Sequence, residues 1–199
     1  MKILRLLALF LVMTMVAPAP STAASPPADV VDNLHNALLA VMKEGKKIGY
    51  KGRRDQLAPV ITTSFDMAFI AKTIVGRYWD TFNAGQRVQF VETFSELSIA
   101  TYASNFDAYS GERFSLVSEK DLNGVQVLIR THLVKSNGEK IEMNYILRPV
   151  EKQWRIINII TDGVSDLALK RADYTAFLKD KNFDALIAKL NEKIARYSR

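Results

Sequence analysis

The 199-residue chain contains no cysteine, and its only two histidines, His35 and His132, are widely separated in the sequence. Without cysteine it has no disulfide, thiolate metal site, iron–sulfur cluster or cysteine nucleophile. Neither histidine has a second ligand at the spacing that zinc or di-iron sites use on a helix. We therefore expect no metal, and an exposed or lightly hydrogen-bonded position for each histidine.

Motifs for catalysis and nucleotide binding are also missing. Residues 163–167 (GVSDL) lack the second glycine of a nucleophile elbow and follow a strand of an antiparallel pattern. The glycines at positions 45, 49 and 52 do not have the spacing of a phosphate-binding loop. The sequence therefore predicts no catalytic residue, no cofactor and no enzymatic activity.

The charge of the chain is weakly basic. Its formal net charge is +6 at pH 7, and Lys2 and Arg5 supply two of the positive charges. Such an excess suits phosphate groups or an anionic membrane surface, and it is too small to indicate a nucleic-acid partner. One segment, residues 43–54 (KEGKKIGYKGRR), concentrates basic side chains. It is either a solvated loop or a contact for a phosphate head group or an acidic partner.

The N-terminus has the layout of a secretory signal peptide. Lys2 and Arg5 flank the start of an apolar run that continues to Val16, and small residues follow. The run is shorter than the about 20 apolar residues that a membrane-spanning helix needs. We expect cleavage of residues 1–24, which leaves residues 25–199 as a single periplasmic domain. The alternative is that the segment remains as an N-terminal anchor.

Helical periodicity dominates both ends of the mature chain, where apolar residues recur at steps of three and four. The predicted helices run from a Ser25 cap to Gly45, over 53–63, over 67–75, from Asn83 to Ser110, and in two pieces after Gly163. The last of these pieces begins at a predicted Asn182 cap.

The middle of the chain predicts strands. Residues 113–120, 125–135, 139–150 and 153–161 are rich in β-branched and aromatic side chains. Asn-Gly pairs separate the first three of these segments, and this dipeptide is the strongest short hairpin signal. The sequence therefore predicts an α+β domain, in which helices cover a twisted four-stranded antiparallel sheet.

Alternation and helical phase place unusually large apolar side chains on the inward face of this sheet and on the helix before it. Such residues either fill a packed core or line an apolar pocket between sheet and helices, and periodicity does not separate the two. The residues predicted to line such a pocket are Tyr102, Phe106, Val127, Ile129, Met143, Tyr145, Leu147 and Trp154.

Several segments resemble a known family of proteins. These are SFDM at 64–67, IVGRYW at 74–79, DGVS at 162–165 and KRADYTAFL at 170–178. They resemble the MlaC-type proteins, also called toluene-tolerance proteins. Residues 100–114 (ATYASNFDAYSGERF) are most similar to the HpnM branch, whose members are associated with hopanoid biosynthesis. Asp166 departs from the pattern, because many relatives have an apolar residue there.

The resemblance implies a soluble periplasmic lipid carrier with a fold like nuclear transport factor 2 and a deep apolar pocket. It implies a phospholipid or hopanoid cargo, passed between an inner-membrane MCE-domain/ABC-transporter complex and an outer-membrane lipoprotein complex, so that outer-membrane lipid asymmetry is maintained. Two other functions remain open, a non-catalytic assembly factor for such complexes and an enzyme acting on a hydrophobic substrate.

Overall fold

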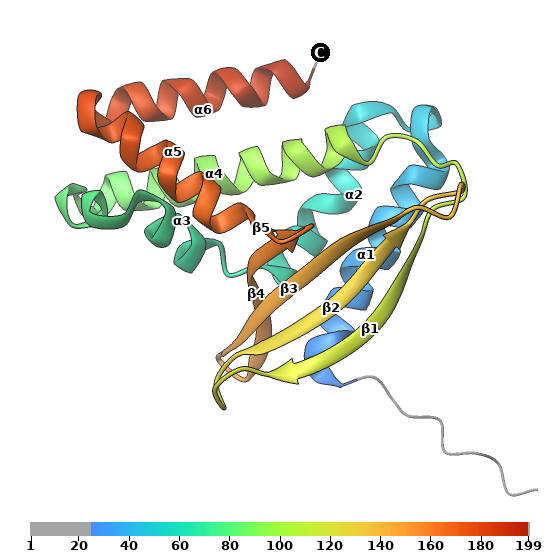
Figure 1. Ribbon diagram of the computed structural model, residues 1–199. Helices are drawn as coiled ribbons and strands as arrows, with labels where there is room; N and C mark the ends of the chain where they lie inside the picture. Colours follow the sequence, from blue (N-terminus) through green and yellow to red (C-terminus); the bar gives the residue numbers. More distant parts are fainter. Residues whose placement is uncertain (1–24, 199) are drawn as a thin grey trace, which may run out of the picture.

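The structure, a computed structural model, describes residues 25–198 (Figure 1). The signal peptide predicted at residues 1–24 lies outside the described residues. The α-helices are α1 (Pro26–Glu44), α2 (Gly49–Ser64), α3 (Met67–Val75), α4 (Ala84–Asn105), α5 (Asp166–Asp180) and α6 (Phe183–Tyr197). Short 3-10 helices, η1 (Gly45–Lys47) and η2 (Gly76–Thr81), connect some of them.

Polar side chains begin several of these helices as their sequences predict. The Ser25 side chain accepts a hydrogen bond from the Ala28 amide at the start of α1. At the start of α4, Asn83 and Gln86 form a capping box, in which each side chain accepts a bond from the other's backbone amide. Asn182 caps α6. Each cap satisfies amide groups that a helix start leaves without partners.

Two predicted helix boundaries are wrong. The second helix begins at Gly49 and not at Arg53, because the turn at η1 already redirects the chain and Gly52 is accommodated inside α2. The fourth helix ends at Asn105, before the predicted stop at Ser110, because Phe106 adopts a non-helical backbone with φ −105° and ψ 60°. The Phe106 ring then stacks on the ring of Tyr102 one turn earlier.

The strands form one antiparallel sheet in the order β1-β2-β3-β4-β5. They are β1 (Arg113–Asp121), β2 (Val127–Val134), β3 (Lys140–Val150), β4 (Gln153–Thr161) and β5 (Val164–Ser165). The predicted count of four omits β5, which pairs with the end of β4. A strand of two residues is too short to show alternation in a sequence.

Helix α1 and the end of α2 lie against one face of the sheet, whereas α3, α4, α5 and α6 gather at the end of the sheet where β4 and β5 lie (Figure 1). Ile129, Tyr145, Leu147 and Ile156 form the fully buried inner surface of the strands. None of the helices in residues 25–198 is both long and apolar enough to cross a membrane.

His35 is buried, so its predicted exposure is wrong, although it does form a hydrogen bond. Only 3% of its surface is exposed. Its Nε2 lies 2.9 Å from the hydroxyl oxygen of Tyr145, and its ring stacks on Phe114 at 3.8 Å. Burial lowers the pKa of His35 to about 3, so the ring is neutral. The side chain lies between α1 and the sheet, a contact that the α1 sequence alone does not reveal.

Candidate functional site

A cavity of about 110 Å³ lies where α4, α5, α6 and β4 meet, and the start of α3 contributes to its wall. Its lining is predominantly apolar, with a small number of polar and charged side chains. The apolar residues are Phe65, Met67, Ile70, Phe94, Leu97, Tyr102, Ile157, Ile159 and Leu167.

The serine and threonine hydroxyl groups that α4 contributes to the wall are bonded to the backbone. Ser98 donates to the Phe94 carbonyl at 2.9 Å, and Thr101 donates to the Leu97 carbonyl at 2.7 Å. Such bonds within a helix leave the hydroxyl without a strong demand for another partner. Ser98 and Thr101 therefore add little polarity to the α4 wall.

Asn158 fixes the side of the cavity formed by β4, β5 and the start of α5. Its side-chain oxygen accepts hydrogen bonds from the Ser165 hydroxyl at 3.1 Å and from the Leu167 amide at 3.2 Å. Ser165 also caps α5 by accepting a bond from the Ala168 amide. The DGVS segment thus has a structural role, which places the first turn of α5 beside the cavity.

The charged side chains of the lining come only from the last two helices. Asp166 and Lys170, one turn apart on α5, form an ion pair. Lys193 is contributed by α6. The result is an amphipathic site, in which α5 and α6 add charges to a cavity whose remaining wall is apolar.

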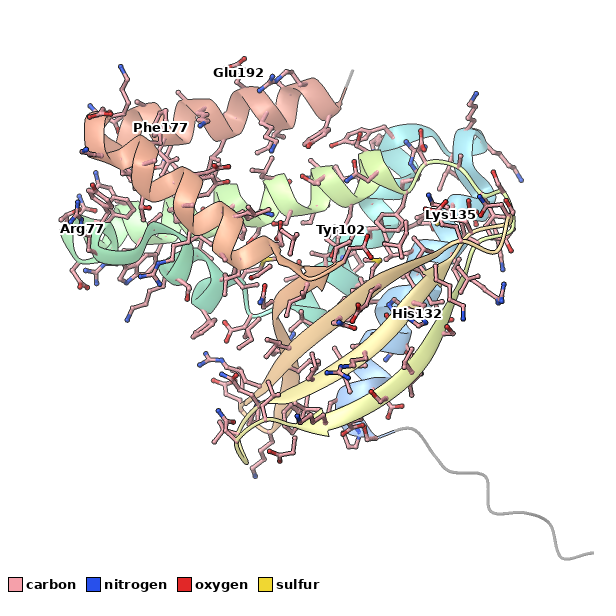
Figure 2. All side chains as sticks on the ribbon, in the orientation of Figure 1. Arg77, Tyr102, His132, Lys135, Phe177 and Glu192 are labelled. Carbon is pink, nitrogen blue, oxygen red and sulfur yellow. The ribbon has the colours of Figure 1, made fainter. Side chains whose placement is uncertain are left out.

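A second hollow of about 300 Å³ adjoins the cavity and shares Tyr102, Thr101 and Ile159 with it. Phe106 and Met143 line this hollow. Tyr102 therefore lies between the two spaces, and Figure 2 shows it between α4 and the strands below. Burial raises the pKa of Tyr102, and the nearby Tyr145 and Asp166 raise it further, so the phenol is neutral.

The structure divides the eight predicted contact residues between cavity and core. Tyr102, Phe106 and Met143 line the cavity or the adjoining hollow. Those that pack in the core and line neither space are Val127, Ile129, Tyr145 and Leu147. Trp154 lines a separate open groove beside Pro26 and Val30 of α1.

Most of the cavity lining does not appear among the predicted residues. Phe94 and Leu97 carry a usable signal, because they lie on the predicted apolar face of the same helix as Tyr102. Met67 and Ile70 belong to the short α3, whose direction relative to α4 is decided by tertiary packing. Lys193 lies on the polar side of α6, where a sequence shows no feature that distinguishes it from other surface lysines.

The basic segment 43–54 is helical and not a loop; its four lysines are exposed, whereas its two arginines make contacts within the protein. Arg53 is only 7% exposed, and it donates hydrogen bonds to the carbonyls of Ala103 at 2.8 Å and Gly45 at 3.1 Å. Arg54 forms an ion pair with Glu96 of α4. The Arg53 guanidinium holds η1 against the end of α4, because carbonyls near helix ends attract cations. The Arg54–Glu96 pair ties α2 to α4.

Within residues 25–198, no group of three histidine, aspartate or glutamate side chains could hold a metal ion. The best-defined polar pair in the interior is His35 with Tyr145. Burial raises the pKa of Tyr145 and lowers that of His35, so both groups are neutral. Neither residue lines the cavity.

Three comparisons with known proteins agree with one another. A sequence model of the family described as "MlaC protein" matches residues 32–192. The "Intermembrane phospholipid transport system binding protein MlaC" of Haemophilus influenzae is 26% identical over 147 residues, which cover 72% of this chain and 67% of the relative. The "Toluene tolerance protein ttg2D" of Pseudomonas putida is 24% identical over 160 residues, covering 78% of this chain and 74% of the relative.

The fold is similar to that of a solved protein from Ralstonia solanacearum, described as a phospholipid-binding protein in complex with a phospholipid. The two structures align with a TM-score of 0.73 over 88% of this chain and 100% of the other. Sequence identity in the alignment is 18%, so the likeness establishes the fold.

Proposed function

This chain belongs to the MlaC family, and we propose that it is a periplasmic carrier that binds a phospholipid in the cavity between α4, α5, α6 and β4. The observation that carries the proposal is the amphipathic lining of that cavity. Its apolar wall suits acyl chains, and its Ser98 and Thr101 hydroxyls are bonded within α4. Removing acyl chains from water supplies about 25 cal/mol per Å² of apolar surface, so no covalent attachment is needed.

The similar proteins support the same cargo. The Haemophilus relative is named as a phospholipid transport binding protein, and the Ralstonia protein was solved with a phospholipid bound. A hopanoid is the alternative cargo, since the apolar wall alone does not distinguish a polycyclic lipid from acyl chains. The carrier function requires no catalytic residue, in agreement with the proposal that the protein is not an enzyme.

The cavity must widen when a lipid enters. Its volume of about 110 Å³ is below the about 300–1,000 Å³ of pockets that hold drug-sized ligands. Helix α6 is anchored through its first half, where Phe183, Leu186 and Leu190 are buried. Beyond Leu190 its side chains are exposed or half-buried. We therefore propose that the second half of α6 moves away from α4 and opens a path into the cavity and the adjoining hollow.

The proposed transport route is supported by the family and by the name of the Haemophilus relative, an intermembrane phospholipid transport system binding protein. We propose that residues 1–24 direct export and are removed, and that residues 25–199 then work as one domain in the periplasm. The carrier exchanges lipid with an inner-membrane MCE-domain/ABC-transporter complex and an outer-membrane lipoprotein complex. Among the eight residues predicted from the sequence, we propose Tyr102, Phe106 and Met143 as direct lipid contacts, because these line the two spaces.

Ser98→Phe tests the carrier function by filling the cavity with an aromatic ring. Ser98 lines the cavity from α4, and its hydroxyl is bonded only within that helix. We expect the variant to fold, since a filled apolar cavity gains contacts, and to lose at least nine-tenths of its bound lipid. The measurement is mass spectrometry of lipid extracted from protein purified from the periplasm.

The matched control is Gln89→Phe, which places the same ring at an exposed position of the same helix. We expect this variant to hold as much lipid as the unaltered protein. Stoichiometric lipid in a folded Ser98→Phe protein refutes the location of the site. A folded, unaltered protein without lipid, which also fails to take lipid from vesicles, refutes the carrier function and favours an assembly factor.

A further inference from the structure

The charges at the cavity are arranged in a way that an apolar cargo alone does not require. Asp166 and Lys170 pair with each other on α5. Lys193 has no carboxylate within 4.0 Å in the described part of the chain, and it lines the same cavity from α6. Together the three groups have one positive charge in excess.

A phosphodiester has the chemistry to match this excess. It carries one negative charge, and the short glycerol backbone joins it to the acyl chains that occupy a cavity. Lysine provides up to three donors on a flexible stem, and charge-assisted bonds to phosphate are among the stronger polar contacts. Because Lys193 lines the same cavity as Phe94, Leu97 and Ile157, a phosphate attached to acyl chains in that cavity can reach it.

We propose that Lys193 binds the lipid phosphate and that Lys170 neutralises Asp166, so that the site selects lipids with a phosphate over uncharged lipids with the same apolar part. The inference rests on the proposed carrier function and adds head-group selection to it. Asp166 is essential to the argument, because an unpaired carboxylate at this position repels a phosphate. The Asp166–Lys170 pair is thus neutral overall, and Lys193 supplies the one positive charge in excess.

This arrangement predicts that the two lysines have different roles. Lys193→Gln removes the phosphate contact and should weaken binding of a phospholipid about fivefold, the upper range for partly exposed ion pairs. Lys170→Gln leaves Asp166 without its partner beside the phosphate and should weaken binding at least as much. Adding Asp166→Asn to Lys170→Gln removes the repulsion and should restore binding, which a purely structural ion pair would not do.

The experiment uses delipidated mature protein and three lipids with the same two oleoyl chains. These are dioleoylphosphatidylglycerol, dioleoylphosphatidylethanolamine and dioleoylglycerol, of which only the last lacks a phosphate. Binding is measured by native mass spectrometry and by transfer from vesicles at low and high salt. Lys179→Gln is the control, because Lys179 is an exposed lysine of α5 that does not line the cavity.

We expect Lys193→Gln to weaken both phospholipids and to leave dioleoylglycerol unchanged, with a smaller difference at high salt. Equal losses for all three lipids, or no loss for any, overturn the phosphate site while lipid binding itself stands. If the unaltered protein takes up none of the three, the carrier function fails first. Failure of the Asp166→Asn change to restore binding overturns the charge-balance role of Lys170.

Discussion

Asp66 connects three parts of the fold beside the cavity, so its replacement has a calculable effect. Its Oδ1 accepts a hydrogen bond from the Phe69 amide at 3.0 Å and thereby caps α3. Its Oδ2 accepts two bonds from the guanidinium of Arg148 on β3, at 2.9 and 2.6 Å. The Asp66 amide donates to the Ile156 carbonyl of β4 at 3.0 Å. Arg148 also lies over the Phe69 ring, 4.3 Å from its centroid.

The two side-chain functions of Asp66 can be separated. Loss of a helix cap costs about 1 kcal/mol. The bidentate pair is partly screened, because the Arg148 side chain is 34% exposed while that of Asp66 is 10% exposed, so we assign it about 1–2 kcal/mol. Asp66→Ala removes both and should lower the free energy of unfolding by about 2–3 kcal/mol. Asp66→Asn keeps a good cap and should cost only about 1–2 kcal/mol.

Urea unfolding of the delipidated mature protein, followed by circular dichroism, measures these differences. At a typical slope of about 2 kcal/mol per M, the Ala variant should unfold at a urea concentration about 1–1.5 M lower than the unaltered protein. Asp173→Ala, at an exposed position of α5, is the control and should leave the midpoint unchanged. Equal midpoints for the Ala and Asn variants refute the capping role, and an Asn midpoint equal to that of the unaltered protein refutes the contribution of the ion pair.

Two further predictions concern groups buried outside the cavity. The folded-state pKa of His35, about 3, lies below its unfolded value of about 6.5, so the unfolded chain binds the extra proton. His35 therefore does not lower the free energy of unfolding above about pH 6.5. As the pH falls from there toward 3, proton uptake by the unfolded chain lowers the free energy of unfolding, by at most about 1.4 kcal/mol per pH unit. Urea titrations from pH 7 to 4 should show a flatter profile for His35→Gln than for the control His132→Gln, and identical profiles contradict the assignment. Arg53→Met removes two buried hydrogen bonds and should lower the free energy of unfolding by about 2–3 kcal/mol. Arg54→Gln loses only a half-exposed ion pair and should cost less than about 1 kcal/mol, and equal losses for both arginine variants contradict the bracing role of Arg53.

Local signals in the sequence were sufficient for most secondary structure. The caps at Ser25, Asn83 and Asn182 act within a few residues, and the Asn-Gly pairs each determine one hairpin. Such interactions depend on neighbours in the chain, so a sequence pattern predicts them well. The short strand β5 was missed because its formation depends on pairing with Ile160 and Thr161 of β4.

The site was predicted less completely, because alternation identifies the face of a strand but not what covers it. Ile129 and Met143 both point inward from the sheet. Ile129 meets the packed core, whereas Met143 faces the hollow beside α4 and α5. The difference arises from the position of each residue along the sheet relative to the helices, which no local pattern encodes.

The sequence by itself determined the class of the domain, its capped helices and hairpins, the lack of cysteine chemistry and the resemblance to the MlaC family. Tertiary structure alone decided that His35 is buried, that Arg53 braces the end of α4, and that Lys193 lies at the cavity. The physical reason is the distance along the chain over which each feature is determined. Caps, turns and periodicity are satisfied within one or two turns of chain, whereas a cavity exists only where elements distant in sequence fail to fill the space between them.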